Sequence, residues 1–349
     1  MPFTFFRSTL FSLAFAATAL AHADMCAQPL PALRALSCSS NQHGAYFAID
    51  AARAALYAEA AGTAAERFQR YFGRAASSGI IVEIAALDAA TRAELARQGA
   101  KWVLNDAPAP SMAGSIRSQL SAQLADQPQA EIDRQVEAVL AQLGGAQLRS
   151  ANSSTDALQR QIGDALLRLA FWPKAAQDAA SYGSPAPDWF DELAAVLMET
   201  EQTSMMRRQH LRAALSDPTH ARSTIAQCLA RQHPASPMLG AEGAAASASI
   251  SVQRVSVADA ATAAAIVQQR QAADLPYAYS RALADFLLKP SQDLLVYSSL
   301  AQALAQGGSL ADWLRTDGAR FGLPENLNAL QSAWSAWLDQ QAKSARGTP

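Results

Sequence analysis

The sequence predicts a predominantly helical α+β fold with a small sheet near the N-terminus. Two short apolar segments, Gly79–Ile84 and Lys101–Leu104, have the length and composition of strands. Most of the remaining chain carries apolar residues three or four positions apart, which is the spacing of an amphipathic helix. Half of the residues are hydrophobic and 17% are charged, which is typical of a globular protein.

The elements of the N-terminal half follow from local signals. A polar segment at residues 37–43 leads into a helix over Tyr46–Ala61, and a second helix is expected over Ala64–Phe72. Asp88 has the residue type of a helix N-cap, and Gly99 has that of a terminator, so a third helix is expected between them. Beyond the second strand, two further helices are expected near Ser111–Leu124 and Gln129–Leu143, the latter ending at Gly144-Gly145.

The C-terminal half is expected to be helical. Helices are predicted over Ser154–Phe171 and Asp188–Thr200, and an arginine-rich helix with Arg207, Arg208 and Arg212 on a solvated face follows. Residues 234–249 are rich in Pro, Gly, Ala and Ser and are expected to form a linker or surface loop. The imperfect alternation of apolar residues over 250–257 predicts a short strand, and four helices, broken at residues 290, 307–308 and 322–324, complete the chain. We therefore divide the chain into an N-terminal α/β region, 24–150, and a helical region, 151–349.

The first 23 residues have the pattern of a secretory signal peptide. Arg7 supplies the positive charge, an apolar run extends from Leu10 to Leu20, and A-x-A sites predict cleavage after Ala21 or Ala23. The apolar run is shorter than the roughly 20 residues of a membrane span. Residues 23–25 before Cys26 do not match a lipobox, so no lipid anchor is expected. We expect export to the periplasm or the medium, without a membrane anchor after cleavage.

The chain contains three cysteines, Cys26, Cys38 and Cys228. An oxidising compartment permits disulfides, and Cys26 and Cys38 are the obvious local pair. Cys228 is then left over and is expected to be a buried thiol, in preference to a nucleophile paired with His233.

Several function classes lack a signal in the sequence. The net charge is −2, which does not indicate a nucleic-acid partner. The chain has no G-x-S-x-G, P-loop, G-x-G-x-x-G or C-x-x-C motif, which removes the support for serine hydrolase, nucleotide-binding and redox functions. Its five histidines include no H-x-H or H-x-x-x-H pair, so a histidine metal site would need residues that are distant in sequence.

One segment carries a more specific signal. Residues 187–192 read Pro-Asp-Trp-Phe-Asp-Glu at the expected start of a helix. This P-x-W-[FL]-x-E turn resembles the third-ligand helix of the gluzincin zinc metallopeptidases, in which the glutamate binds zinc. Residues 277–287, 308–310 and 334–338 resemble later parts of the same family. The resemblance covers roughly residues 155–340, implies a gluzincin-like (thermolysin-like) core with a C-terminal helical lobe, and places Glu192 at the ligand position.

The resemblance also implies an HExxH helix upstream of Glu192, and the pentapeptide at the expected place is Arg160-Gln161-Ile162-Gly163-Asp164. Zinc hydrolysis needs imidazoles at i and i+4 and a glutamate base beside the first. Arg160 cannot deprotonate to bind a metal, and the amide of Gln161 cannot accept a catalytic proton. Asp164 is a hard oxygen ligand that suits calcium or magnesium. The spacing of the motif is retained, but its chemistry is lost.

The loss of zinc would leave Glu192 as a partly buried carboxylate. We hypothesise that the guanidinium of Arg160 has taken the place of the metal between Asp164 and Glu192, since an uncompensated buried charge costs about 3–5 kcal/mol. The simpler alternative is an exposed Arg160–Asp164 pair, which contributes only tenths of a kcal/mol. By the same resemblance, Tyr277 and Tyr279 are candidates for an oxyanion-stabilising phenol. Without a metal-bound water, packing or hydrogen bonding is the better interpretation of both.

These observations predict an exported, non-catalytic gluzincin-like protein, or pseudo-peptidase. Its former cleft is expected either to be filled or to bind a peptide or protein, and no cofactor is expected. The first alternative is a hydrolase with altered ligands that holds zinc or another divalent metal at Asp164, Glu192 and a distant histidine. The second is a helical interaction module unrelated to peptidases.

Overall fold

The structure is a computed structural model of the chain, and it describes residues 25–106, 121, 128–175, 184–231 and 275–346, with the backbone alone for 136–154 and 345–346. The described part is a mostly helical α+β fold, in which a four-stranded mixed sheet is followed by helices. The chain forms two compact units. The first comprises residues 1–65 and 76–162, and the second comprises residues 66–75 and 163–349.

The sheet of the first unit has the strand order β1-β2-β3-β4. The strands are β1 (Ser37–Asn41), β2 (Gly44–Ala48), β3 (Gly79–Val82) and β4 (Trp102–Asn105). β1 pairs antiparallel with β2, whereas β2, β3 and β4 are parallel. Parallel strands need a crossover connection, and helices supply both of them here. The two strands predicted from apolar segments are confirmed.

The hairpin of β1 and β2 corrects two expectations. Residues 37–41 form a strand and not a polar entry segment, and Tyr46 and Phe47 belong to β2 and not to a helix. The Asn41 side chain stabilises the tight turn, because its Oδ1 accepts hydrogen bonds from His43 N at 2.7 Å and from the Tyr46 hydroxyl at 3.0 Å. These bonds and pairing with β2 outweigh the low strand propensity of Ser and Asn.

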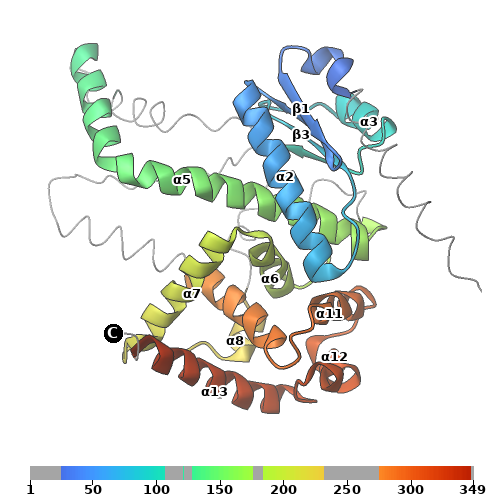
Figure 1. Cartoon of the computed structure of the whole chain (residues 1–349), viewed down its shortest axis with the longest axis vertical. Helices are drawn as coiled ribbons and strands as arrows, with labels where there is room; N and C mark the ends of the chain where they lie inside the picture. The colour runs from blue at the N-terminus through green and yellow to red at the C-terminus, as the bar shows by residue number, and fades with distance from the viewer. Residues whose placement is uncertain (1–24, 107–120, 122–127, 176–183, 232–274, 347–349) are drawn as a thin grey trace, which may run out of the picture. The chain divides into compact units, whose positions relative to one another are not determined.

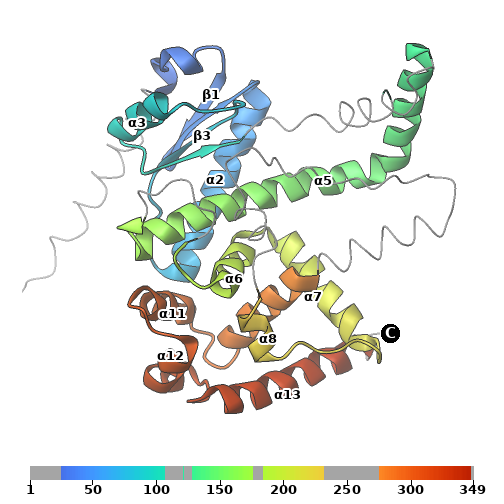
Figure 2. The same cartoon turned by 180° about the vertical axis from the view of Figure 1, so that it is seen from behind.

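Figures 1 and 2 show helix α2 (Ala51–Phe72) on one face of the sheet and α3 (Ala89–Arg97) on the other. On the α2 face, the Asn41 amide donates to the carbonyl oxygen of Ala58 at 2.7 Å. On the α3 face, the 3-10 helix η1 (Pro31–Leu33) also packs against the sheet through Leu33. The core on this face contains Met25, Leu33, Ala45, Phe47, Ile80, Val82, Leu95 and Ala100. As expected, Asp88 caps α3 by accepting from Thr91 N, and Gly99 follows its end with φ +105°.

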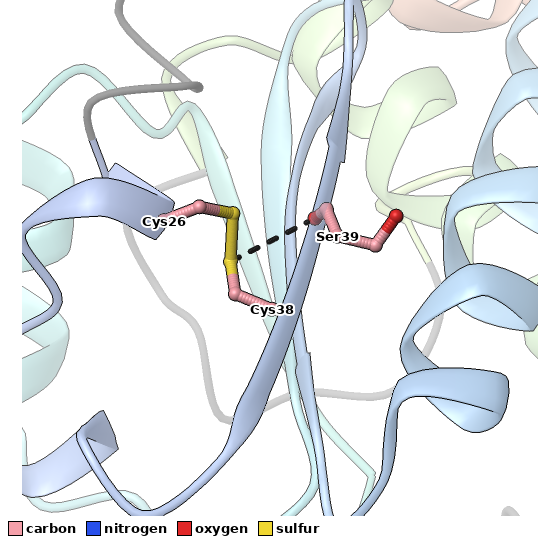
Figure 3. Close-up of a disulfide and its surroundings, with 3 residues drawn as sticks. All are labelled: Cys26, Cys38 and Ser39. Carbon is pink, nitrogen blue, oxygen red and sulfur yellow. Dashed lines mark hydrogen bonds between the residues drawn. A yellow bond between two sulfur atoms is a disulfide. The ribbon is translucent and has the colours of Figure 1, made fainter.

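Cys26 and Cys38 form a disulfide with a Cα–Cα distance of 5.4 Å. Figure 3 shows the bond joining the N-terminal segment to β1. Both cysteines pack against the same core, so the disulfide fixes the N-terminal segment over the α3 face.

Two helices are longer than the sequence analysis expected. α2 runs without a break over Ala51–Phe72, and α5 runs over Gln129–Phe171, through Gly144-Gly145. Each glycine costs about 1 kcal/mol relative to alanine in a helix. The alanine-, leucine- and glutamine-rich residues on either side are good helix formers, so the helix continues. Both helices contribute to both units, because the division falls within each of them.

The second unit is built from helices that largely match the predicted ones. The predicted helix over Asp188–Thr200 is confirmed as α6, which ends two residues earlier, and the C-terminal breaks at 290, 307–308 and 322–324 are confirmed. Trp313 and Trp334 are fully buried, as expected of core residues. The elements are α6 (Asp188–Met198), α7 (Glu201–Ser216), α8 (Ile225–Leu229), a helix over 275–288, α11 (Leu295–Ala305), α12 (Leu310–Thr316), the 3-10 helix η3 (Gly318–Phe321) and α13 (Leu327–Arg346).

Some expectations lie outside the described residues. These are the signal peptide, the helix near Ser111–Leu124, the linker at 234–249, the strand at 250–257, and His22 and His233. Within the described part of the chain, no helix has the length and apolar character that crossing a membrane requires.

Candidate functional site

Helix α6 carries the predicted ligand position, and a polar turn sets its start. Pro187 is the N-cap, and its carbonyl accepts from Phe190 N at 2.8 Å. The Asp191 carboxylate accepts from Ser184 N at 2.9 Å and from the Ser184 hydroxyl at 2.6 Å. Ser184 Oγ in turn accepts from Ala186 N at 3.0 Å. These hydrogen bonds hold residues 184–187 (Ser-Pro-Ala-Pro) against the first turn of α6. The start of the helix is thereby fixed, and Glu192 lies in its second turn.

α6 is buried on every side. Each residue from Trp189 to Met198 is buried, including Asp191 and Glu192. A helix that is buried all round belongs to the centre of its unit. The carboxylates of Asp191 and Glu192 are therefore in the core, where an ionised group needs compensation.

The C-terminus of α6 is held by two arginines. Arg67, from the last turns of α2, donates to the carbonyl oxygens of Leu197 and Glu199, where a cation is favoured by the helix dipole. The Glu199 carboxylate is fully buried and forms a bidentate pair with Arg207 of α7, with Nε–Oε2 and Nη2–Oε1 distances of 2.5 Å. Arg207 was expected on a solvated face. It is instead buried, because Glu199 supplies the paired charge that its guanidinium needs.

Helices α5 and α6 approach closely within the second unit. A Cβ atom added to Gly163 would lie 2.3 Å from Met198 Cγ, so a side chain at position 163 would force Met198 to move. Asp164 follows Gly163 on α5 and is buried, as is Glu192 on α6. The structure therefore places two of the predicted site carboxylates in the core of one unit, on two helices that pack against each other.

The other two positions of the pentapeptide differ in environment. Arg160 is half-buried and belongs to the first unit, whereas Asp164 and Glu192 belong to the second. Gln161 is exposed. The compensation of Asp164 and Glu192 by Arg160 stays a prediction.

The two candidate tyrosines are engaged in packing and hydrogen bonding. The Tyr279 hydroxyl is 3.0 Å from His220 Nε2 and accepts from Ser223 N at 3.2 Å. The ring of Tyr277 lies 4.7 Å from the guanidinium carbon of Arg207, as a cation–π contact. Both tyrosines thus help to join the helix over 275–288 to α7 and to the segment before α8.

The residues present do not fit a zinc ion. Among the residues that the structure describes, no three His, Cys, Asp or Glu side chains are grouped as metal ligands. At the motif itself the donors are two carboxylates and a guanidinium, and a guanidinium has no lone pair to offer a metal.

Cys228, the cysteine outside the disulfide, is a buried thiol. Burial raises the pKa of the Cys228 thiol to about 11, although the positive charge of Arg231 acts to lower it. The thiol is therefore a poor nucleophile.

A cluster of charged and polar side chains lies in the first unit, at the carboxyl ends of β3 and β4. Arg53 pairs with Glu83 at 2.7 Å and with Asp106 at 3.2 Å, and the Tyr57 hydroxyl donates to Asp106. This mutually satisfied cluster braces α2 against the sheet.

Asp191 is a group that the sequence analysis did not single out. Burial raises its pKa to about 7, and the two hydrogen bonds from Ser184 lower it only in part. A partial signal was present in the sequence, because the residues of α6 other than Asp188, Asp191 and Glu192 are apolar. Asp188 in the first turn is partly exposed, whereas Asp191 is buried.

The raised pKa of Asp191 predicts a pH-dependent stability. Between about pH 4 and 7 the folded protein holds a proton that the unfolded chain has released, so the unfolding free energy falls as the pH rises through this window. Asp191→Asn removes this pH-dependent loss of stability, because asparagine does not ionise. The amide oxygen of the new asparagine can still accept the hydrogen bond from Ser184 N. We expect the variant to gain about 2 kcal/mol relative to the native chain between pH 5 and pH 8, measured by urea unfolding.

Glu66→Gln is the matched control, because Glu66 is an exposed carboxylate of the same unit. Its difference from the native chain should be the same at both pH values. An Asp191→Asn difference that is equally independent of pH would contradict the raised pKa.

No protein-family model matches the chain, and no curated protein or solved structure shows significant similarity to it.

Proposed function

We propose that this chain is an exported, non-catalytic protein with a gluzincin-like core, a pseudo-peptidase in which a zinc site has been replaced. The observation that carries the proposal is the burial of Asp164 and Glu192 on helices α5 and α6, which pack against each other at Gly163 and Met198. These are the two acidic positions that the degenerate motif predicts. The resemblance to gluzincins supplies the family, and the helix packing supports it.

Buried carboxylates are unfavourable for folding alone. Removing an ionised group from water costs several kcal/mol unless a cation or hydrogen bonds compensate it. A helix that served only to fill the core would be expected to carry apolar residues at both positions. The carboxylate of Glu192, at the ligand position, is instead what a former metal site would leave behind, and residues that break a local rule are expected at functional sites.

The same positions speak against peptide hydrolysis. The general-base position holds Gln161, an exposed amide, and the described residues contain no group of three metal ligands. The protein would therefore act by binding. A peptide or protein ligand follows from the family resemblance, which implies a cleft next to α5 and α6.

Restoring the zinc motif tests the proposal. The triple variant Arg160→His, Gln161→Glu and Asp164→His, with native Glu192, is expected to bind about one zinc ion per chain, because the ligand spacing of the family would be complete. The native chain is expected to bind none. Zinc content after dialysis is measured by elemental analysis, and folding is followed by circular dichroism.

Glu192→Gln in the triple variant is the control, and it should lower zinc affinity at least tenfold if Glu192 is the third ligand. Arg160→His alone is a milder variant for the case in which the triple variant does not fold, since position 160 is half-buried and Asp164 and Glu192 stay in place. A folded variant that binds no zinc, or binds it equally with Gln at position 192, would refute the proposal. Stoichiometric zinc in the native chain would favour an enzyme with altered ligands.

A further inference from the structure

A cavity of about 280 Å³ lies within the second unit, away from Asp164 and Glu192 in sequence and lined by neither. Its walls come from α7, the helix over 275–288 with the turn that follows it, and α13. This volume is slightly below the lower end of the range for small-molecule pockets, which is about 300 Å³. The space therefore limits a ligand to about one ring and a short chain.

The charges that line the cavity are unbalanced. Arg208, Arg212 and Lys289 contribute three cations, and Asp285 is the one carboxylate among the lining residues. Arg212 and Lys289 are both exposed, at the rim. The Lys289 ammonium donates to the Gln340 amide oxygen at 2.8 Å, a neutral partner that leaves its charge uncompensated.

Asp285 is already neutralised by arginines. Its Oδ2 accepts from Arg208 Nε at 2.8 Å, and its Oδ1 accepts from Arg281 Nη2 at 2.6 Å. Burial opposes ionisation of Asp285, but the hydrogen bond from Arg208 and the charge of Arg281 outweigh it and lower its pKa. The carboxylate is thus ionised and paired, and it does not offset the charges of Arg212 and Lys289.

The inner wall of the cavity is apolar and rigid. Trp337 is buried there with Leu211, and Ala278 and Ala282 complete the surface. Trp337 is held by stacking on Trp334, with ring centroids 5.3 Å apart and planes inclined by 16°. A flat apolar group can pack on such a wall without ordering a mobile side chain, which avoids part of the entropic cost of binding.

We propose that this cavity binds a small organic carboxylate, with its apolar group against Trp337 and its carboxylate between Arg212 and Lys289. A single negative charge on the ligand complements the excess positive charge at the opening of the cavity. The apolar wall disfavours a ligand that needs hydrogen bonds on all sides. The carboxylate belongs either to a free acid or to the C-terminus of a peptide with an apolar last residue. This inference does not depend on the proposed function.

The probe is 3-(4-fluorophenyl)propionate, with binding to the full chain followed by ¹⁹F line broadening. We expect saturable binding that weakens as salt is added, since exposed charges are screened. The neutral analogue, 3-(4-fluorophenyl)propan-1-ol, should bind at least about tenfold more weakly. Competition by N-acetyl-phenylalanine distinguishes a peptide C-terminus from a free acid as the natural ligand. If the natural ligand is a peptide C-terminus, N-acetyl-phenylalanine should bind more tightly than the fluorophenylpropionate probe. If it is a free acid, the probe should bind more tightly.

Arg212→Gln with Lys289→Gln should weaken binding of the acid at least about tenfold without affecting the alcohol. The matched control is Arg97→Gln with Lys101→Gln, which removes the same charge from exposed positions in the first unit. Equal binding of acid and alcohol, or the same affinity in the two double variants, would overturn the proposal. Circular dichroism checks that all variants are folded, and the pairs alter only exposed side chains.

Discussion

Arg207→Ala is expected to lower the free energy of unfolding by about 3–5 kcal/mol, because it leaves a fully buried carboxylate without its cation. Glu199 has no exposed surface, and both of its oxygens accept from the Arg207 guanidinium at 2.5 Å. The same substitution removes the cation–π contact with Tyr277. Urea unfolding, followed by tryptophan fluorescence, measures the loss, since five of the six tryptophans lie in the second unit.

Two variants separate the charge effect from the loss of a side chain. Arg315→Ala is the surface control, because Arg315 pairs with Asp312 three residues away but is 70% exposed, and such pairs contribute at most about 1 kcal/mol. The double variant Glu199→Met and Arg207→Met removes both charges and should retain most of the native stability, since apolar replacements of buried ion pairs are often tolerated. A loss at Arg207→Ala no larger than at Arg315→Ala would contradict the buried pair.

Cys26→Ala with Cys38→Ala is expected to destabilise the first unit by about 3 kcal/mol. The disulfide closes a loop across a sequence separation of 12 residues, and loops of this size restrict the unfolded chain by about that amount. The N-terminal segment, which contributes Met25 to the core on the α3 face, should be the first part to loosen.

Hydrogen exchange of the β2 and β3 amides reports on the first unit alone and is therefore the suitable measurement. Added reductant should reproduce the effect in the native chain and have none on the double variant. Cys228→Ala is the control, because this buried thiol forms no disulfide and its removal should leave the response to reductant unchanged. Unchanged exchange in the double variant would show that the core holds the N-terminal segment without the disulfide.

Local signals predicted the elements whose ends are marked by local chemistry. Asp88 and Gly99 delimit α3 as expected, and the β-branched run after Gly79 is a strand. β1 was missed because Ser37–Asn41 has little strand character of its own, and its conformation depends on pairing with β2 and on the turn bonds of Asn41. The ends predicted inside α2 and α5 were wrong, because a glycine costs a long helix only about 1 kcal/mol and the helix-forming residues on either side offset this cost.

For the candidate site, the sequence analysis selected Asp164 and Glu192, and the structure describes both carboxylates as buried. The P-x-W-F-x-E turn identified α6 and Glu192, and helical periodicity placed Asp164 on a helix upstream. The Glu199–Arg207 pair and the buried Asp191 were missed, because both depend on α6 being enclosed on all sides. That enclosure comes from elements that are distant in sequence, such as α2, whose Arg67 reaches the end of α6.

The way the chain is shared between the two units restricts how the protein can be dissected. Residues 66–75, which lie far upstream, are part of the second unit, where Tyr71 packs against Tyr297 and Arg74 donates to the carbonyl oxygen of Ala170. A fragment that starts at residue 163 would lose these partners, and one that ends at residue 162 would carry a helical end with nothing to cover it. Neither half is an autonomous piece, so limited proteolysis within α2 or α5 would damage both units together.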